Sequence, residues 1–359
     1  MTTKKKTKKN TVKNHKSSSI KKFFIFLLII TLIACSFAGY MFYFFNNVNT
    51  GSKKSAYLYI HTGSNFNNLL DSINSKKILK ETVSFKLFAK FKRYDKHIKP
   101  GRYLLKKGMS NNQIVNLLRS GKQDPVKVVL HNIRLKEELA SKVAKYLEAD
   151  SVKILDMLNN KDYLSKYNLN PDNVLSMIIP NTYIMNWNTS AEKFLDRMTK
   201  EYKMFWTKDR IKKADALNLT PVEVSILASI VQSESLKEDE MTTIAGVYIN
   251  RLRKGILLQA DPTVVYAIGD FSINRVLKKQ LSVDSPYNTY KYKGLPPGPI
   301  TLPYPTTIDK VLDYKGHEYL YFCAKEDFSG HHNFAKTEAE HNKNAKKFQH
   351  ALDARNIKR

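Results

Sequence analysis

The chain has 359 residues, of which 42% are hydrophobic, so it is long enough for a membrane anchor together with one large or two modest folded domains. This composition excludes an intrinsically disordered protein. The formal net charge of +28 is typical of proteins that bind nucleic acid, an anionic membrane surface or an acidic polymer. Which of these partners applies depends on the cellular compartment in which the charged part of the chain lies.

The first 45 residues predict a basic tail followed by a membrane-spanning helix. Residues 1–22 contain nine lysines and no acidic residue, and residues 23–45 contain no charged residue. A helix over 23–45 is about 34 Å long, which suffices to cross a hydrocarbon core of roughly 30 Å. Because lysines crowd only the N-terminal flank, the positive-inside rule places the tail in the cytoplasm and the rest of the chain outside. Nucleic acid is therefore excluded as a partner.

Two other interpretations of this segment are less favoured. A cleaved secretory signal has an apolar region of about 7–15 residues, and this region is longer. The stretch "LIAC", ending at Cys35, is similar to a bacterial lipoprotein processing box, but the apolar run continues for ten residues beyond it. We therefore expect Cys35 to lie inside a membrane helix. Cys323 is the only other cysteine, so no intramolecular disulfide is expected in the outer part.

The exported part of the chain is itself basic. Nine of the 28 net positive charges lie in residues 1–22, so +19 remain for the rest. Outside a bacterial membrane the abundant anionic polymer is the cell wall, and long-range attraction would favour it as a partner. A solvated surface that only keeps the domain soluble explains the same charge.

The outer part predicts two α+β regions after a linker at residues 46–55. Residues 56–124 read as strand, helix, helix, strand and helix, with "GRYLL" as the second strand and Ser110 and Gly121 bounding the last helix. Residues 125–359 read as one larger domain, with a strand at "VKVVLHNI" and helices at "KEELASKVAKYL" and "AEKFLDRMTKEYKMFW". From the pattern alone, the smaller region is equally compatible with a generic spacer domain.

The stretch "TPVEVSILASIVQSES" predicts a helix that carries a carboxylate on its apolar face. Thr220 and Glu223 form a capping box at its start. Glu234 falls at helical spacing on the face formed by Val224, Leu227 and Val231. An apolar environment raises the pKa of a carboxyl, as a general acid near neutrality requires. The alternative is that the helix ends near Ser233 and Glu234 faces solvent.

Three more segments follow this helix. "TIAGVYINRLRKG" predicts a second helix that ends at Gly255, with Tyr248 on its apolar face and Arg251 in its last turn. Asp261 and Pro262 read as the N-cap and first position of a short helix, which explains Asp261 structurally and predicts that asparagine serves nearly as well there. "SPYNTYKYKGLPPGPI" reads as a strand-like run followed by a rigid proline-rich loop.

Four motifs together resemble the YceG-like family of endolytic murein transglycosylases, in the same order and at similar spacing. They are "LASIVQSES", "GVYINRLRKGILLQADPTVVYAIG", "SPYNTYKYKGLPPGPI" and "GHHNFAKTEAEHNKN". The resemblance covers the large domain from about Lys127 onward. The smaller region, with "KPGRYLLKKGMSNNQIVNLLRSG", resembles the LysM-like module that precedes the catalytic domain in this family. The implied fold is α+β, with one N-terminal transmembrane helix, a small LysM-like module and a larger YceG-like domain.

The resemblance implies a lyase that cuts the MurNAc-GlcNAc bond within peptidoglycan glycan strands, leaves 1,6-anhydro-MurNAc ends and limits the length of nascent strands. It also implies a catalytic glutamate in the first motif. Many members have an acid on both sides of the motif's central residue, whereas this chain has Gln232 on one side and Glu234 on the other. Glu234 is therefore the expected catalytic residue, unless the protein is inactive.

Six further residues are candidates for contacts with sugar rings and N-acetyl groups, although each could be structural: Asn250, Gln259, Asp261, Asn288, Tyr290 and His332. No metal is expected, because the histidines lack ligand spacing, and no cofactor is expected. Expected partners are the glycan strands, the bilayer through residues 23–45 and cell-wall synthases. Expected location is the bacterial cytoplasmic (inner) membrane. A non-catalytic wall-binding scaffold and a hydrolytic glycosidase remain the alternatives.

Overall fold

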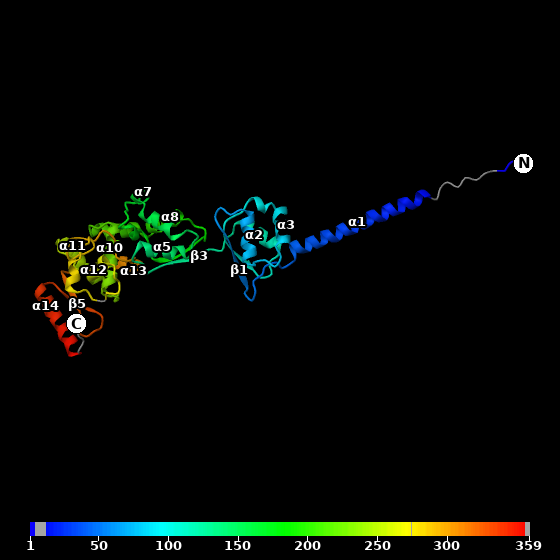
Figure 1. The fold of residues 1–359 in the computed structure, drawn as a ribbon. Helices are drawn as coiled ribbons and strands as arrows, with labels where there is room; N and C mark the ends of the chain where they lie inside the picture. The colour runs from blue at the N-terminus through cyan, green and yellow to red at the C-terminus, as the bar shows by residue number, and fades with distance from the viewer. Residues whose placement is uncertain (4–11, 274, 356–359) are drawn as a thin grey trace. The chain divides into compact units, whose positions relative to one another are not determined.

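The computed structural model of the chain describes residues 1–3, 12–273 and 275–355, so residues 4–11 of the predicted cytoplasmic tail lie outside the described residues. The chain forms two compact units (Figure 1). Unit 1 comprises residues 1–125 and 186–188, and unit 2 comprises residues 126–185 and 189–359.

Unit 1 begins with the apolar helix α1, Val12–Tyr43. Its segment Ser19–Tyr43 has a mean hydropathy of 2.4, and its most apolar part is not buried in the protein, as suits a helix surrounded by lipid. The helix ends at Tyr43 rather than at the predicted Phe45. The N–H groups of Phe44 and Phe45 both donate to the carbonyl of Tyr40, which closes the last turn.

The rest of unit 1 follows the predicted order of elements. Strands β1, Ser55–Ile60, and β2, Gly101–Lys106, pair antiparallel, with Ser55 opposite Lys106. The helices are α2, Phe66–Ser75, α3, Val83–Phe91, and α4, Asn111–Ser120, with a 3-10 turn η1 at Tyr94–Lys96. Gly121 ends α4 in the left-handed conformation that glycine accepts without strain, with φ of 72°.

The first half of unit 2 is a second antiparallel ribbon covered by helices. Strand β3, Val126–Leu130, pairs with β4, Asn181–Met185. The helices of this half are α5, Lys136–Ala144, α6, Ser151–Asn159, α7, Lys161–Ser165, α8, Ala191–Phe205, and α9, Lys208–Ala216, with a 3-10 turn η2 at Val174–Met177. All three helix and strand segments predicted here from periodicity are present.

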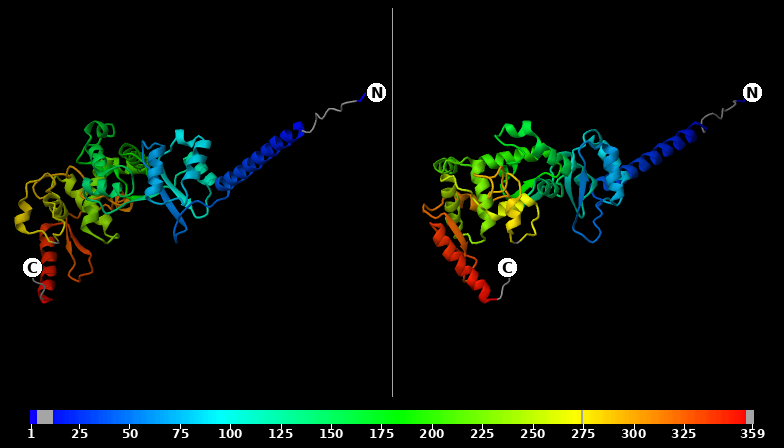
Figure 2. Two further views of the ribbon diagram at one scale, coloured as in Figure 1. Left: turned by 45° about the vertical axis from the view of Figure 1, so that its right-hand side comes forward. Right: turned by 60° about the vertical axis from the view of Figure 1, so that its left-hand side comes forward.

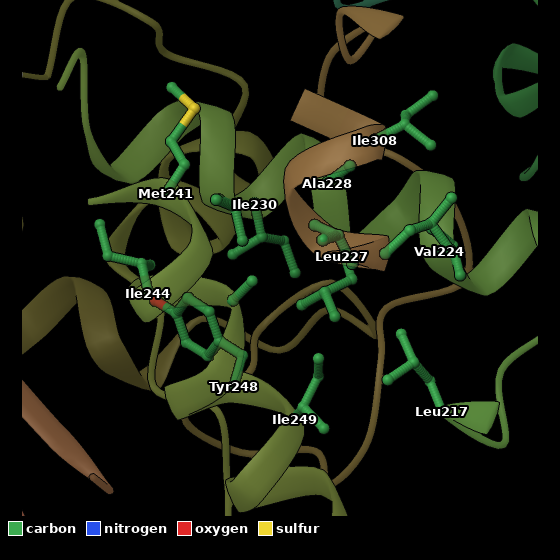
Figure 3. Packing of buried hydrophobic residues seen from close by; sticks show 14 of the residues in the cluster. Leu217, Val224, Leu227, Ala228, Ile230, Met241, Ile244, Tyr248, Ile249 and Ile308 are labelled. Atoms are coloured by element: carbon green, nitrogen blue, oxygen red, sulfur yellow. The ribbon is translucent and has the colours of Figure 1, made fainter. Parts of the chain in front are cut away.

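The second half of unit 2 is built on helix α10, Pro221–Glu234, and helix α11, Met241–Arg253. The other elements are α12, Asp261–Ile268, η3, Lys278–Ser282, α13, Pro305–Leu312, β5, Tyr321–Ala324, β6, His332–Ala335, and α14, Glu338–Ala354. Strands β5 and β6 form an antiparallel ribbon beside α14 at the C-terminal end of this unit (Figure 2). Figure 3 shows Leu227 and Ile230 of α10 facing Ile244 and Tyr248 of α11 in the core.

One predicted strand is absent. Residues 285–292 form successive turns rather than a strand. The buried side chain of Asn288 donates to the carbonyls of Leu281 and Val283 and accepts from the N–H of Tyr290, so it satisfies backbone groups that a strand partner would otherwise satisfy. The tyrosine-rich sequence of this segment therefore does not reflect a sheet.

The packing between α10 and α11 predicts a large cost for a cavity at Leu227. Replacing Leu227, which is fully buried, with alanine should lower the free energy of unfolding by about 2–5 kcal/mol, measured by urea denaturation. Val152→Ala is the control, because Val152 on α6 is exposed, and its effect should stay within about 0.5 kcal/mol. A Leu227→Ala effect no larger than the control would contradict the packing described here.

Candidate active site

Helix α10 ends at Glu234, which follows the buried aliphatic stripe on the same face of the helix. Val224, Leu227 and Val231 of this stripe are fully buried, as their spacing predicted. The backbone turns out of the helix at Ser235, which is extended. The hydroxyl of Tyr248, from α11, donates a hydrogen bond of 2.7 Å to Oε1 of Glu234. The carboxyl group is thus held against α11 and is only partly exposed.

The surroundings of Glu234 favour its protonated form. Burial raises the pKa of the Glu234 carboxyl to about 7; the hydrogen bond from Tyr248 opposes this shift, and the negative charge of Asp261 adds to it. Burial also raises the pKa of the Tyr248 hydroxyl well above its ordinary value, so this hydroxyl remains a donor. Because Oε1 accepts its hydrogen bond, the acidic proton of neutral Glu234 is expected on Oε2.

Asp261 does not cap helix α12, contrary to the prediction from sequence. The helix begins at Asp261 itself, and Ala260 occupies the N-cap position with extended backbone. The start is shifted because Thr263 donates to the carbonyl of Ala260 at 2.7 Å and Thr289 accepts from its N–H at 3.0 Å. The exposed carboxylate of Asp261 instead accepts a 2.5 Å hydrogen bond from the hydroxyl of Tyr290. Capping therefore does not explain this acid.

Two cavities of unit 2 meet at Glu234 and Asp261. The larger has a volume of about 810 Å³, and its other lining residues include Arg134, Tyr266, Phe271 and Tyr304. The smaller has a volume of about 510 Å³, and its other lining residues include Arg251, Gln259, Tyr290, Phe322 and His332. Since both carboxyl groups line both cavities, an elongated ligand can occupy the two cavities together and place an internal bond beside Glu234.

Four of the predicted polar residues lie together in the smaller cavity: Gln259, Asp261, Tyr290 and His332. Gln259 has a left-handed backbone, with φ of 54°, and its Oε1 accepts from Nη1 of Arg251 at 3.0 Å. His332 is held through Nδ1 and its backbone N–H, which contact the two carboxylate oxygens of Glu240 at 3.0 and 2.9 Å. The structure therefore brings these side chains to the same cavity as Glu234.

The other two predicted residues lie outside the lining of both cavities. Asn250 donates from Nδ2 to the carbonyls of His317 and Tyr319, at 2.7 and 3.0 Å, and so ties the segment before β5 to α11. Asn288 is fully buried and holds the turn that carries Tyr290. Both side chains shape the walls of the site through the backbone.

Two residues of the site were missed from the sequence. Tyr248 was assigned only to an apolar helix face, although a buried tyrosine hydroxyl usually has a polar partner, which was the available signal. Arg251 was assigned to a helix end, but it is buried, and its guanidinium donates to three backbone carbonyls, those of Leu257, Leu258 and Leu320. Burial lowers the pKa of Arg251. No ion pair to Arg251 exists among the described residues.

Gln232 has a structural role that an ionised acid could not fill. Its Oε1 accepts from the N–H of Tyr304 at 2.6 Å and from the hydroxyl of Thr307 at 3.2 Å. Its Nε2 donates to the carbonyl of Leu302 at 3.2 Å, and a carboxylate has no proton to donate there. Gln232 thus fixes the loop that forms part of the larger cavity.

Within the part of the chain that the structure describes, no group of three or more His, Cys, Asp or Glu side chains is arranged to hold a metal ion. His331 contacts Asp239, with 3.2 Å between Nε2 and Oδ2. The ring of His341 stacks on the ring of Tyr321, so neither histidine belongs to a metal-binding group of this kind in the described part of the chain.

Comparison with known proteins relates the chain to one family. The sequence pattern described as the YceG-like family matches residues 58–347. The chain is 29% identical to the endolytic murein transglycosylase of Bacillus subtilis (strain 168), over 84% of this chain and 87% of that protein. It is 28% identical to the endolytic murein transglycosylase of Streptococcus pneumoniae (strain R6), over 83% of this chain and 59% of that protein. A crystal structure of a YceG-like protein from Listeria monocytogenes has a TM-score of 0.54 and 29% identity, covering 81% of this chain and 99% of that one.

The contacts of Glu234 predict opposite pKa changes in two variants. Tyr248→Phe removes the hydrogen bond that stabilises the carboxylate, so the pKa of Glu234 should rise above about 7. Asp261→Asn removes a nearby negative charge, so the pKa should fall. The measurement is an NMR titration of the glutamate side-chain carbons, with Glu234→Gln used to assign the signal. Shifts of the same sign in both variants would contradict this description of the site.

Proposed function

Because this chain belongs to the YceG-like family, we propose that it is a lytic transglycosylase that cuts peptidoglycan glycan strands internally, with Glu234 as its catalytic acid and base. The bond cleaved joins MurNAc to GlcNAc, and the new end is 1,6-anhydro-MurNAc. The observation that carries the residue assignment is a carboxyl group with a pKa of about 7 at the meeting point of two cavities. Such a group is protonated in a large fraction of molecules near neutrality.

The reaction uses the same carboxyl twice. Neutral Glu234 donates its proton from Oε2 to the glycosidic oxygen while the bond from that oxygen to C1 of MurNAc breaks. The resulting carboxylate accepts the proton of the muramyl 6-hydroxyl while that oxygen bonds to C1. The ring closes, Glu234 is protonated again and no water is consumed. One carboxyl therefore suffices, whereas hydrolytic glycosidases usually need two.

Tyr248 and Asp261 have separate roles in this scheme. Tyr248 occupies Oε1 and so leaves Oε2 as the oxygen that exchanges protons with the substrate. Asp261 supplies a negative charge beside the position where positive charge develops on the sugar as the bond breaks, which stabilises the transition state. Its exposed carboxylate also supports the second candidate function, hydrolysis, in which it would activate water. Hydrolysis would give reducing ends, which distinguishes the two reactions.

The two cavities match the needs of a polymeric substrate. In the larger cavity the aromatic rings of Tyr266, Phe271 and Tyr304 offer faces on which sugar rings can pack. In the smaller cavity Gln259, Tyr290 and His332 offer hydrogen bonds to hydroxyl and N-acetyl groups. This arrangement suits cleavage within a strand.

The proposed location rests on α1. We propose that Ser19–Tyr43 spans the bacterial cytoplasmic membrane, with the N-terminus in the cytoplasm and unit 2 outside, because the lysines lie on the N-terminal side. Unit 1 then corresponds to the LysM-like module next to the membrane. Contact with cell-wall synthases would follow from this shared location.

The proposed chemistry predicts that Glu234→Gln folds normally but loses activity. Glutamine keeps the shape of the side chain but can neither donate nor accept the proton, so formation of anhydro ends should fall by about three orders of magnitude. The assay is chromatography of purified glycan strands after incubation with each protein. Glu223→Gln, the same substitution in the first turn of α10 and outside the lining of both cavities, is the matched control and should retain full activity. Substantial anhydro product from Glu234→Gln would refute the assignment.

The proposed topology predicts where a reporter works. An enzyme active only outside the cytoplasmic membrane should function when fused after Arg359 and fail when fused before Phe23. Activity in the reverse pattern would overturn the proposed orientation.

A further inference from the structure

Helix α3 of unit 1 has two apolar faces, and only one of them is covered. Phe85, Phe88 and Ala89 point into the core and are fully buried. Val83, Leu87 and Phe91 follow one another at intervals of four residues and are 66%, 56% and 71% exposed. Residues four apart lie above one another on a helix, so these three side chains form a continuous exposed stripe, called here the α3 stripe. Such a stripe is unfavourable in water unless something covers it.

The α3 stripe lies beside the end of the apolar helix α1. Between ring centres, Phe88 lies 4.9 Å from Phe42 and 5.5 Å from Tyr43 of α1. The ring centre of Phe91, in the stripe, lies 6.0 Å from that of Phe88. Asn111 of α4 donates from Nδ2 to the carbonyl of Met41 at 3.1 Å and holds the same end of α1. Figure 1 shows α3 next to the C-terminal end of α1, and the views in Figure 2 agree.

Exposed aromatic side chains continue this surface onto α1 itself. Tyr40, Tyr43 and Phe44 are all exposed on the last turn of α1 and the residue after it. Tyrosine and other aromatic residues at the end of a membrane span characteristically lie at the level of the lipid headgroups. The α3 stripe therefore adjoins a segment that itself belongs at the membrane surface.

The charges around the α3 stripe suit lipid phosphates. Lys86 and Lys90 alternate with the stripe residues along α3 and are exposed, and neither has an ion pair within the described ranges of the chain. Arg93 is exposed just beyond the helix. The acid just before α3, Glu81, is occupied at the start of the helix, where its carboxylate accepts from the N–H groups of Val83 and Ser84. An apolar stripe bordered by cations is the pattern of a helix that lies in a membrane interface.

We propose that α3 lies on the outer surface of the bilayer that α1 spans, with the α3 stripe in the boundary between headgroups and acyl chains and with Lys86 and Lys90 at the phosphates. This inference rests on the proposed membrane anchoring by α1. Its consequence is that unit 1 is fixed to the bilayer at two points, the end of α1 and α3, rather than tethered by a single helix. The lipid surface is the occupant that fits, because α3 packs on the end of the span itself.

The test is depth-dependent quenching with the full-length chain in lipid nanodiscs. A thiol-reactive fluorophore is attached at Leu87→Cys, or separately at Phe91→Cys, in a background carrying Cys35→Ser and Cys323→Ser. The matched control is Asp71→Cys, which places the same label at an exposed position on α2 of the same unit. A further sample keeps native Cys35, inside α1, as the only thiol and reports whether the span is in the bilayer.

The proposal expects a quencher carried near the lipid headgroups to reduce the Leu87 and Phe91 signals several-fold more than the Asp71 signal, while a quencher at the acyl-chain centre reduces the Cys35 signal. Equal responses at Leu87 and Asp71, with Cys35 quenched, would overturn the inference and leave the anchoring intact. Protection of Leu87 from an aqueous quencher without quenching by lipid would mean that protein, a second copy or a partner, covers the stripe, which also overturns it. An unquenched Cys35 would refute the anchoring and the inference together.

Discussion

The hydrogen bond from Tyr248 to Glu234 joins the end of α10 to the middle of α11, and the chemistry proposed for the site depends on it. Burying a carboxyl group among apolar side chains is costly unless a donor replaces water. Tyr248 supplies this donor from a ring that is itself buried in the core between the two helices. Packing and chemistry therefore share one side chain: the aliphatic contacts that hold α10 against α11 also fix the oxygen of Glu234 that remains available to a substrate.

The same two helices support both cavities, because their polar side chains form hydrogen bonds with the backbone of the segments around them. On α10, Ser229 accepts from the N–H of Ile300, and Gln232 holds the loop at Tyr304, so this helix supports the larger cavity. On α11, Asn250 binds the segment before β5, and Arg251 binds the carbonyls of residues 257, 258 and 320, so this helix supports the smaller cavity. Parts of both cavities are thus held in place by the helix pair that carries Glu234.

The features predicted from sequence were those that neighbouring residues determine. The capping box of Thr220 and Glu223 marks the start of α10, and helical spacing places the aliphatic stripe before Glu234. The order of elements in unit 1 follows in the same way. These features need no knowledge of distant contacts, because the groups that satisfy each other lie within one or two helical turns.

The features that were missed or wrong depend on residues far apart in the chain. Thr289 lies 26 positions after Thr263, yet their contact sets the start of α12 and frees Asp261 from capping. Tyr248 lies 14 positions after Glu234, and no local pattern links the two. Residues 285–292 resemble a strand in sequence because the segment is rich in tyrosine, which is enriched in strands, while the buried amide of Asn288 determines the actual backbone. The periodicity of a short segment cannot predict hydrogen bonds between residues that lie far apart in the sequence.

The pH dependence of kcat/KM for formation of 1,6-anhydro ends by the unmodified protein tests directly whether the Glu234 carboxyl acts as both acid and base. In the proposed mechanism Glu234 enters the reaction protonated, and its pKa is about 7, so kcat/KM should fall about tenfold per pH unit above that value. Between about pH 5 and pH 6.5, titration of Glu234 should cause little change. A kcat/KM that stays constant, or rises, from pH 7 to pH 9 would show that the reaction does not need protonated Glu234.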